Sequence, residues 1–143
     1  MKFVEVIDLN VFGDHRGSLI SLEENSAVVP FDVKRVYYIF DTKEDVVRGK
    51  HAHKKLEQLV IAVSGECNFY VDNGFEQQMI KIDRPSKAIY IKGLVWREMM
   101  DFSDDCVLMV LASEHYDTAD YIYDYDEFVR EVRGIPLSSL KKG

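Results

Sequence analysis

Short segments of strand-forming residues, separated by turn residues, run through most of the chain, and this spacing most constrains its fold. The segment 35–40 is aromatic and β-branched, as strands are. Asp72-Asn73-Gly74 lies between two such segments and is a strong β-hairpin signal. We expect strands at 3–9, 18–22, 34–40, 50–63 with a possible break, 66–72, 75–82, 87–91, 95–101 and 106–113.

Many short strands followed by one helix predict an all-β protein. The runs 59–63 and 106–112 are apolar throughout, so we expect strands that are buried on both faces. Only the C-terminal part has a helical pattern, in which Asp124 can cap a helix whose apolar face carries Phe128, Val129 and Val132. We therefore predict one domain, residues 1–143, built as a jelly-roll β-barrel or β-sandwich with a short C-terminal helix.

The composition excludes one class of partner and indicates a compartment. The net charge is −7, from 18 basic and 25 acidic residues, whereas a general nucleic-acid coat needs a basic surface. No apolar run reaches the roughly 18 residues that span a bilayer, and Glu5 lies where a signal peptide needs an apolar stretch. Cys67 and Cys106 lie in apolar segments, so we expect buried, reduced thiols. These features predict a cytoplasmic protein that binds neither nucleic acid nor membrane.

Two histidines, His51 and His53, stand two residues apart in a predicted strand. Side chains at i and i+2 of a strand point the same way, and both histidines share parity with Glu57 and with the apolar residues Leu59, Ile61 and Val63. We therefore expect all of them to face the barrel interior. Two imidazoles and a carboxylate in a cavity form either a metal site or an acid–base site. The alternative is a pair of surface histidines in a lysine-rich loop.

The histidine pair, the following Glu57 and a glycine turn at Gly65 resemble the first motif of the cupin superfamily, with one extra residue before the glycine. The second cupin motif ends in a metal-binding histidine, and Arg97 stands at that place here. A guanidinium has no lone pair for a metal, and its charge repels one. We therefore expect a cupin site without metal or another cofactor, although His51, His53 and Glu57 could alone form a facial triad.

An acidic protein can bind an anionic ligand only through a local cluster of cations, and several arginines flank these motifs. Arg35 and Tyr37 share a strand face, and guanidinium forks suit phosphate oxygens. Glu57 can orient a histidine or balance its charge, and Tyr37 can hydrogen-bond or stack on a ligand. The substrate-binding candidates are Arg16, Arg35, Arg48, Arg97 and Glu57. The alternatives are solvated arginines, an ion-paired Glu57 and a Tyr37 that only packs in the core.

Several longer blocks resemble the sugar 3,4-ketoisomerases, which act on dTDP-4-keto-6-deoxy-D-glucose. The resemblance covers roughly residues 5–130. Its most specific blocks are Lys34-Arg35-Val36-Tyr37-Tyr38-Ile39-Phe40-Asp41 and Arg48-Gly49-x-His51-Ala52-His53-Lys54-Lys55-Leu56-Glu57-Gln58. Further blocks are Asp14-x-Arg16-Gly17-Ser18-Leu19, Val95-Trp96-Arg97-Glu98-Met99, Asp101-Phe102-Ser103, Val110-Leu111-Ala112-Ser113-Glu114, Tyr116-Asp117, Asp120-Tyr121-Ile122 and Tyr125-Asp126-Glu127-Phe128.

The resemblance implies a metal-independent cupin isomerase whose product feeds an aminotransferase that makes a 3-amino-3,6-dideoxyhexose for surface polysaccharides such as lipopolysaccharide O-antigen. It implies that His51 and His53 move the protons, that Tyr37 lines the site, and that the protein is a homodimer with exchanged N-terminal strands. Relatives that form the galacto product have arginine at the position of Arg16 and histidine at that of Arg97. This chain has arginine at both, so Arg16 favours a galacto configuration at C4 and Arg97 a gluco one.

The chemistry expected of this substrate is proton transfer through an enediol shared by C3 and C4. We expect His51 to be the carbon base, with His53 assisting the second proton transfer, and Arg97 or Tyr37 to stabilise the enediolate. The diphosphate would bind Arg35 or Arg48. The alternatives are a dTDP-sugar 3,5-epimerase-like enzyme, a metal-dependent cupin and a sugar-binding cupin without activity.

Overall fold

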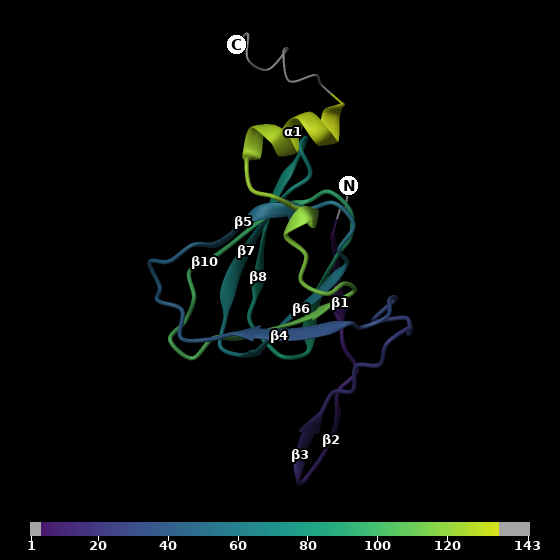
Figure 1. The fold of residues 1–143 in the computed structure, drawn as a ribbon. Coiled ribbons are helices and arrows are strands. Elements are labelled where there is room, and N and C mark those ends of the chain that lie inside the picture. Colours follow the sequence, from purple (N-terminus) through teal and green to yellow (C-terminus); the bar gives the residue numbers. More distant parts are fainter. Residues whose placement is uncertain (1–3, 135–143) are drawn as a thin grey trace.

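The computed structural model describes residues 4–134, and two five-stranded antiparallel sheets form its body (Figure 1). The first sheet has the order β1 (Val4–Asp8), β9 (Lys87–Ile91), β6 (Gln58–Ser64), β11 (Val107–Ala112) and β4 (Arg35–Ile39). The second has the order β12 (Tyr121–Ile122), β5 (Arg48–His53), β10 (Trp96–Met100), β7 (Cys67–Asp72) and β8 (Gln77–Ile82). Strands that are neighbours in a sheet are mostly distant in sequence, which is the topology of a jelly roll.

The predicted jelly roll with a C-terminal helix is confirmed, but as a sandwich rather than a closed barrel. In the part of the chain that is described, β4 and β12 each end a sheet and do not pair with the other sheet. The break expected within 50–63 falls at residues 54–57, and it places β5 and β6 in different sheets. Phe3, the first residue of the first predicted strand, lies outside the described residues.

Both faces of β6 are buried, as its apolar run predicts. Val60 and Ala62 face the core between the sheets, where Phe69 and Leu108 also lie. Leu59 and Ile61 face the opposite way and pack in an outer cluster with side chains of the 20–33 segment. Burying an aliphatic side chain stabilises the fold by roughly 1.5–3 kcal/mol. Because its alternate side chains lie in different clusters, β6 connects the two cores. The end of β6 departs from the expected burial of the run 59–63, since Val63 is 43% exposed.

The chain closes with η1 (Thr118–Asp120), β12 and the helix α1 (Tyr125–Arg133). Asp124 caps α1 as predicted, because its side chain accepts a hydrogen bond from the Asp126 backbone N–H. Phe128 is buried beneath the helix. The helix lies against the predicted β7–β8 hairpin, where a Cβ on Gly74 would meet Val132 Cγ1 at 2.8 Å. Only glycine fits this contact, since Gly74 also has a φ of +93°.

A second hairpin, β2 (Phe12–Asp14) with β3 (Gly17–Leu19), projects away from the body (Figure 1). Its side chains are exposed, including the apolar Phe12 and Leu19. Cys67 and Cys106 are buried and unbridged, as predicted. No helix within residues 4–134 is long and apolar enough to cross a membrane.

Candidate active site

The two histidines lie together between the sheets, on β5. Their ring centroids are 4.8 Å apart, with the planes nearly perpendicular. His51 is opposite Arg97 of β10 in the strand register, and His53 is opposite Tyr121 of β12. The Tyr121 ring lies 4.3 Å from the His53 ring and 5.0 Å from that of His51. The pairing of β5 with both neighbours therefore collects two imidazoles, a guanidinium and a phenol.

Arg97 is a buried cation at the centre of this group, with 2% of its surface exposed. Its Nε and Nη2 donate to the Val95 carbonyl at 3.2 and 2.9 Å, and its Nη1 donates to Gln58 Oε1. The Gln58 amide nitrogen in turn donates to the Tyr37 hydroxyl at 2.9 Å. This chain of hydrogen bonds joins β10, β6 and β4, so it fixes Arg97 and Tyr37 relative to each other across the two sheets.

Burial and the charge of Arg97 keep both imidazoles neutral at physiological pH. Burial, and secondly Arg97, lowers the pKa of His51 to about 4. The pKa of His53 is lowered by the same two causes and by His51 itself. Burial lowers the pKa of Arg97 to about 10, which leaves it charged. Burial raises the pKa of Tyr37, so that its hydroxyl keeps its proton. The site thus presents two neutral bases beside a fixed positive charge.

Arg35 and four tyrosines also line the site. The Arg35 guanidinium lies 5.1 Å from the Tyr37 ring centroid and 5.7 Å from that of Tyr116. Tyr121 stacks on Tyr123 at 5.2 Å, with an interplanar angle of 13°. Tyr116 and Tyr123 are largely exposed. A cation among partly exposed aromatic rings suits an anionic ligand that carries a planar base.

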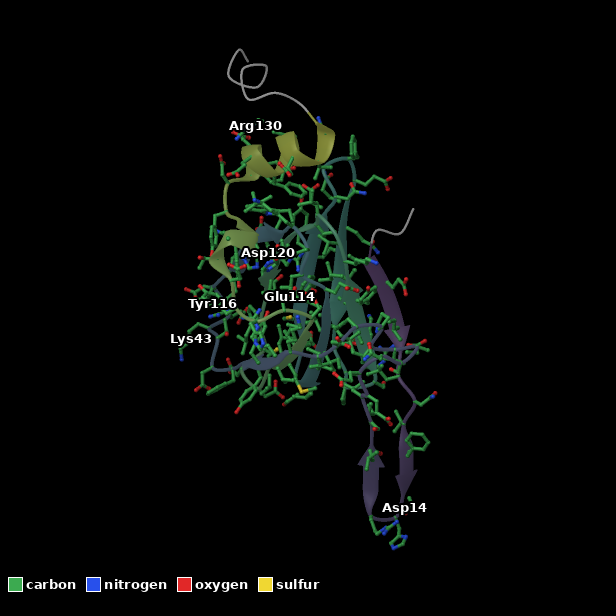
Figure 2. All side chains as sticks on the ribbon, turned by 45° about the vertical axis from the view of Figure 1, so that its right-hand side comes forward. Asp14, Lys43, Glu114, Tyr116, Asp120 and Arg130 are labelled. Atoms are coloured by element: carbon green, nitrogen blue, oxygen red, sulfur yellow. The ribbon has the colours of Figure 1, made fainter. Side chains whose placement is uncertain are left out.

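Three predicted site residues lie elsewhere or at the margin. Glu57 does not share the face of the histidines, because the turn at 54–57 changes the parity of the strand; its carboxylate accepts a hydrogen bond from Tyr90 beside the outer cluster. Arg16, 79% exposed, pairs with Asp14 at the tip of the projecting hairpin. Figure 2 shows Asp14 at that tip, far from Asp120 and Tyr116. Arg48 lies exposed at the start of β5.

Tyr121 and Asp120, which belong to a block of the family resemblance but were not predicted as site residues, also contact this site. Oδ2 of Asp120 lies 3.3 Å from Nδ1 of His53. Both residues follow the last long strand, and the strand that carries Tyr121 has only two residues, too few to show a period. Within residues 4–134, His, Cys, Asp and Glu side chains form no group of three or more that could hold a metal ion.

The chain is similar to a known protein family and to several characterised relatives. The family described as "FdtA: WxcM-like, C-terminal" matches residues 2–133. A TDP-4-oxo-6-deoxy-α-D-glucose-3,4-oxoisomerase from Aneurinibacillus thermoaerophilus is 50% identical over 133 residues, which are 93% of this chain and 95% of that relative.

Two solved structures are similarly close. A TDP-quinovose 3,4-ketoisomerase from Campylobacter jejuni is 48% identical with a TM-score of 0.87, covering 91% of this chain and 99% of its own. A histidine-to-asparagine variant of the 3,4-ketoisomerase QdtA from Thermoanaerobacterium thermosaccharolyticum, in complex with TDP-4-keto-6-deoxyglucose, is 41% identical with a TM-score of 0.90, covering 96% and 99%.

Proposed function

This chain belongs to the FdtA family of sugar 3,4-ketoisomerases, and we propose that it converts dTDP-4-keto-6-deoxy-D-glucose to the 3-keto-6-deoxy sugar with the gluco configuration at C4. It is an isomerase of dTDP-linked keto sugars. The observation that carries the proposal is the buried, hydrogen-bonded Arg97, which is opposite His51 in the strand register and acts on both neutral imidazoles. This arrangement suits proton transfer at a carbon next to a carbonyl, where negative charge develops on oxygen.

The reaction moves two protons and needs no oxidant. His51 takes the proton from C3, the electron pair of that bond forms the C3–C4 double bond, and the carbonyl pair moves onto O4. Arg97 stabilises the negative charge on that oxygen. We assign the hydroxyl proton transfer to His53, whose sugar-facing ring nitrogen takes the proton from O3 and passes it to O4. The O3 electron pair forms the new carbonyl, and C4 takes up a proton.

The configuration at C4 depends on the face that receives this last proton. In the gluco product, the C3 proton that is lost and the C4 proton that is gained lie on opposite faces of the ring, whereas the galacto product needs one face only. The histidines come from β5 and the protonated Tyr37 from β4, which belong to opposing sheets. We therefore assign the C4 proton to Tyr37, which then regains a proton from solvent while His51 releases the C3 proton to solvent. The arginine at position 97, where galacto-forming relatives have histidine, supports the same outcome, whereas the arginine at position 16 favours the galacto product.

Binding of the nucleotide is assigned to the cations on the two strands that flank the site. Arg35 is held over Tyr37 and Tyr116, and Arg48 begins the strand that carries the histidines. Guanidinium groups bind diphosphate oxygens with two parallel hydrogen bonds. An anchored diphosphate would hold the sugar beside His51, so that its binding energy contributes to catalysis.

Assembly and compartment are the remaining parts of the proposal. The projecting β2–β3 hairpin exposes Phe12 and Leu19, which exchange of this hairpin in a homodimer would bury. Because β1 pairs with β9 of its own chain, the proposed exchange concerns β2 and β3.

The two unbridged cysteines fit a reducing compartment, so we propose a cytoplasmic enzyme.

The test is incubation of the purified protein with dTDP-4-keto-6-deoxy-D-glucose after treatment with EDTA, followed by NMR of the product. The proposal predicts a 3-keto sugar with an equatorial C4 hydroxyl and a rate that chelation does not change. A product inverted at C5 would favour the epimerase, and activity lost with EDTA and restored by a divalent ion would favour a metal-dependent cupin.

A further inference from the structure

Asp120 is a buried carboxylate that the fold holds in one position. Its side chain is about 6% exposed. Its two oxygens accept hydrogen bonds from the backbone N–H groups of Lys55 at 2.9 Å and Leu56 at 3.3 Å, and its own carbonyl accepts one from Lys54 at 3.0 Å. These contacts connect η1 to the turn that follows β5. The carboxylate is therefore fixed relative to that strand and to the histidines on it.

His53 turns one ring nitrogen toward this carboxylate. Its Nδ1 is buried and has no hydrogen-bond partner of good geometry among the described residues, and Oδ2 of Asp120 lies 3.3 Å away. A neutral imidazole carries its proton on one nitrogen and a lone pair on the other. A lone pair on Nδ1 would face a carboxylate oxygen and be repelled, whereas an N–H there would be attracted. Hydrogen bonds of this kind are often long in a free enzyme and shorten when substrate binds.

We propose that Asp120 is a positioning residue that holds His53 in the tautomer with the proton on Nδ1, so that the lone pair of Nε2 is presented to the sugar. This inference rests on the proposed function, in which His53 carries a hydroxyl proton from O3 to O4. Only a lone pair can accept that proton, and Nδ1 is turned away from the sugar by its contact with Asp120. With the other tautomer, His53 would present an N–H to the sugar and could accept the O3 proton only after giving its own proton to O4.

The groups around the His53 ring leave Asp120 to determine which of its two nitrogens carries the proton. Arg97 lowers the pKa of this ring as a nearby positive charge, and the rings of His51 and Tyr121 lie 4.8 and 4.3 Å from it; none of the three supplies a negative charge at neutral pH. Since the pKa of His53 is lowered by burial and by Arg97, the ring is neutral and its two nitrogens differ. In the described part of the chain, Asp120 is the carboxylate within ion-pair distance of this ring.

The first test reads the tautomer without any activity. Wild-type protein with ¹⁵N-labelled histidine is measured by NMR at pH 7, and the His53 signals are identified by their loss in His53→Gln. The inference predicts a protonated Nδ1 and an unprotonated Nε2. A proton on Nε2 overturns it, whether or not the protein turns over substrate. Conversely, absence of turnover together with the expected tautomer would contradict the proposed function alone.

The second test reverses the tautomer. In Asp120→Asn, the amide oxygen can still accept a backbone N–H, while its NH₂ group faces Nδ1 and favours a lone pair there. We expect kcat to fall by roughly 10²–10⁴-fold with KM changed little, the range usual for loss of an acid–base group, and the NMR signals to exchange roles. The matched control is Asp117→Asn, the exposed cap of the same η1, which should leave kcat and the tautomer unchanged.

Unchanged kcat and tautomer in a folded Asp120→Asn would overturn the inference. Loss of kcat with an unchanged tautomer would also overturn it, because the loss would then have a merely structural origin. If the variant fails to fold, the wild-type spectrum decides the question.

Discussion

Arg97 and Arg16, which the family resemblance ties to the same stereochemical choice, lie in two contrasting regions. Arg97 is buried between the sheets and its nitrogens donate to Val95 and Gln58, so its position is set by β10 and β6. Arg16 is exposed on a projecting hairpin and pairs with Asp14, two residues away. An exposed ion pair of this kind contributes about 0–1 kcal/mol. Within the single chain, the buried charge can act on a reaction, whereas the exposed one is screened by water.

The sharpest contrast between the two regions is expected for their histidines. His51→Asn keeps a polar side chain that cannot take up a proton at neutral pH. We expect a loss in rate beyond the roughly 10²–10⁴-fold credited to general acid–base catalysis alone, with an unchanged circular dichroism spectrum. His15→Asn, on the exposed hairpin, should change the rate less than about twofold, in line with the small effects of surface substitutions. Near-normal turnover of His51→Asn would mean that another group is the base.

The two arginines provide the second comparison. Arg97→Met removes the charge next to the developing enediolate, and we expect kcat to fall roughly 10²–10³-fold, as for loss of one oxyanion-stabilising group. Arg16→Ala should leave kcat within about twofold of wild type, because in the single chain the charge it removes is exposed and already paired with Asp14. Steady-state kinetics on both variants measures this difference. An equal loss in both would show that the hairpin acts on the reaction and would break the comparison.

The pocket should also determine how stability responds to acid. The pKa of His51 in the folded protein is about 4, against 6.5 for the free side chain, so the unfolded chain binds protons more readily between these values. Its contribution to stability is therefore complete above pH 6.5 and is lost as the pH falls toward 4. Urea denaturation across this range should show a smaller loss for His51→Asn than for wild type or for His15→Asn. Equal losses in all three would contradict the assigned pKa.

The smallest expected effect concerns the hairpin and is a twofold decrease in the molecular mass of the assembly. Exchange of β2 and β3 between two copies would bury Phe12 and Leu19, which are exposed in the single chain. Replacing both with serine removes this apolar surface, so we expect light scattering to report a monomer where wild type is a dimer. Arg16→Ala on the same hairpin is the control and should remain dimeric. A monomeric wild type would contradict the exchange.

Much of the fold could be predicted from local patterns, whereas the full site could not. Alternation and turn residues indicated the longer strands, and Asp124 indicated the helix, because these signals depend on neighbouring residues. The predicted faces of Glu57, Leu59 and Ile61 were wrong, since the turn at 54–57 interrupts the strand and parity does not continue through a turn. The contact of Asp120 with His53 depends on pairing between distant segments, so no local pattern could reveal it.

The central claim is that the pocket moves protons between C3 and C4 through an enediol, and deuterium tests it most directly. Turnover of unlabelled substrate in D₂O should give a product with one solvent deuterium at C4. Turnover of C3-deuterated substrate in H₂O should leave no deuterium at C4, because the proposed donor and base act on opposite faces. Deuterium at C5 would contradict the account, as would an unlabelled product in D₂O together with no transfer of the C3 label.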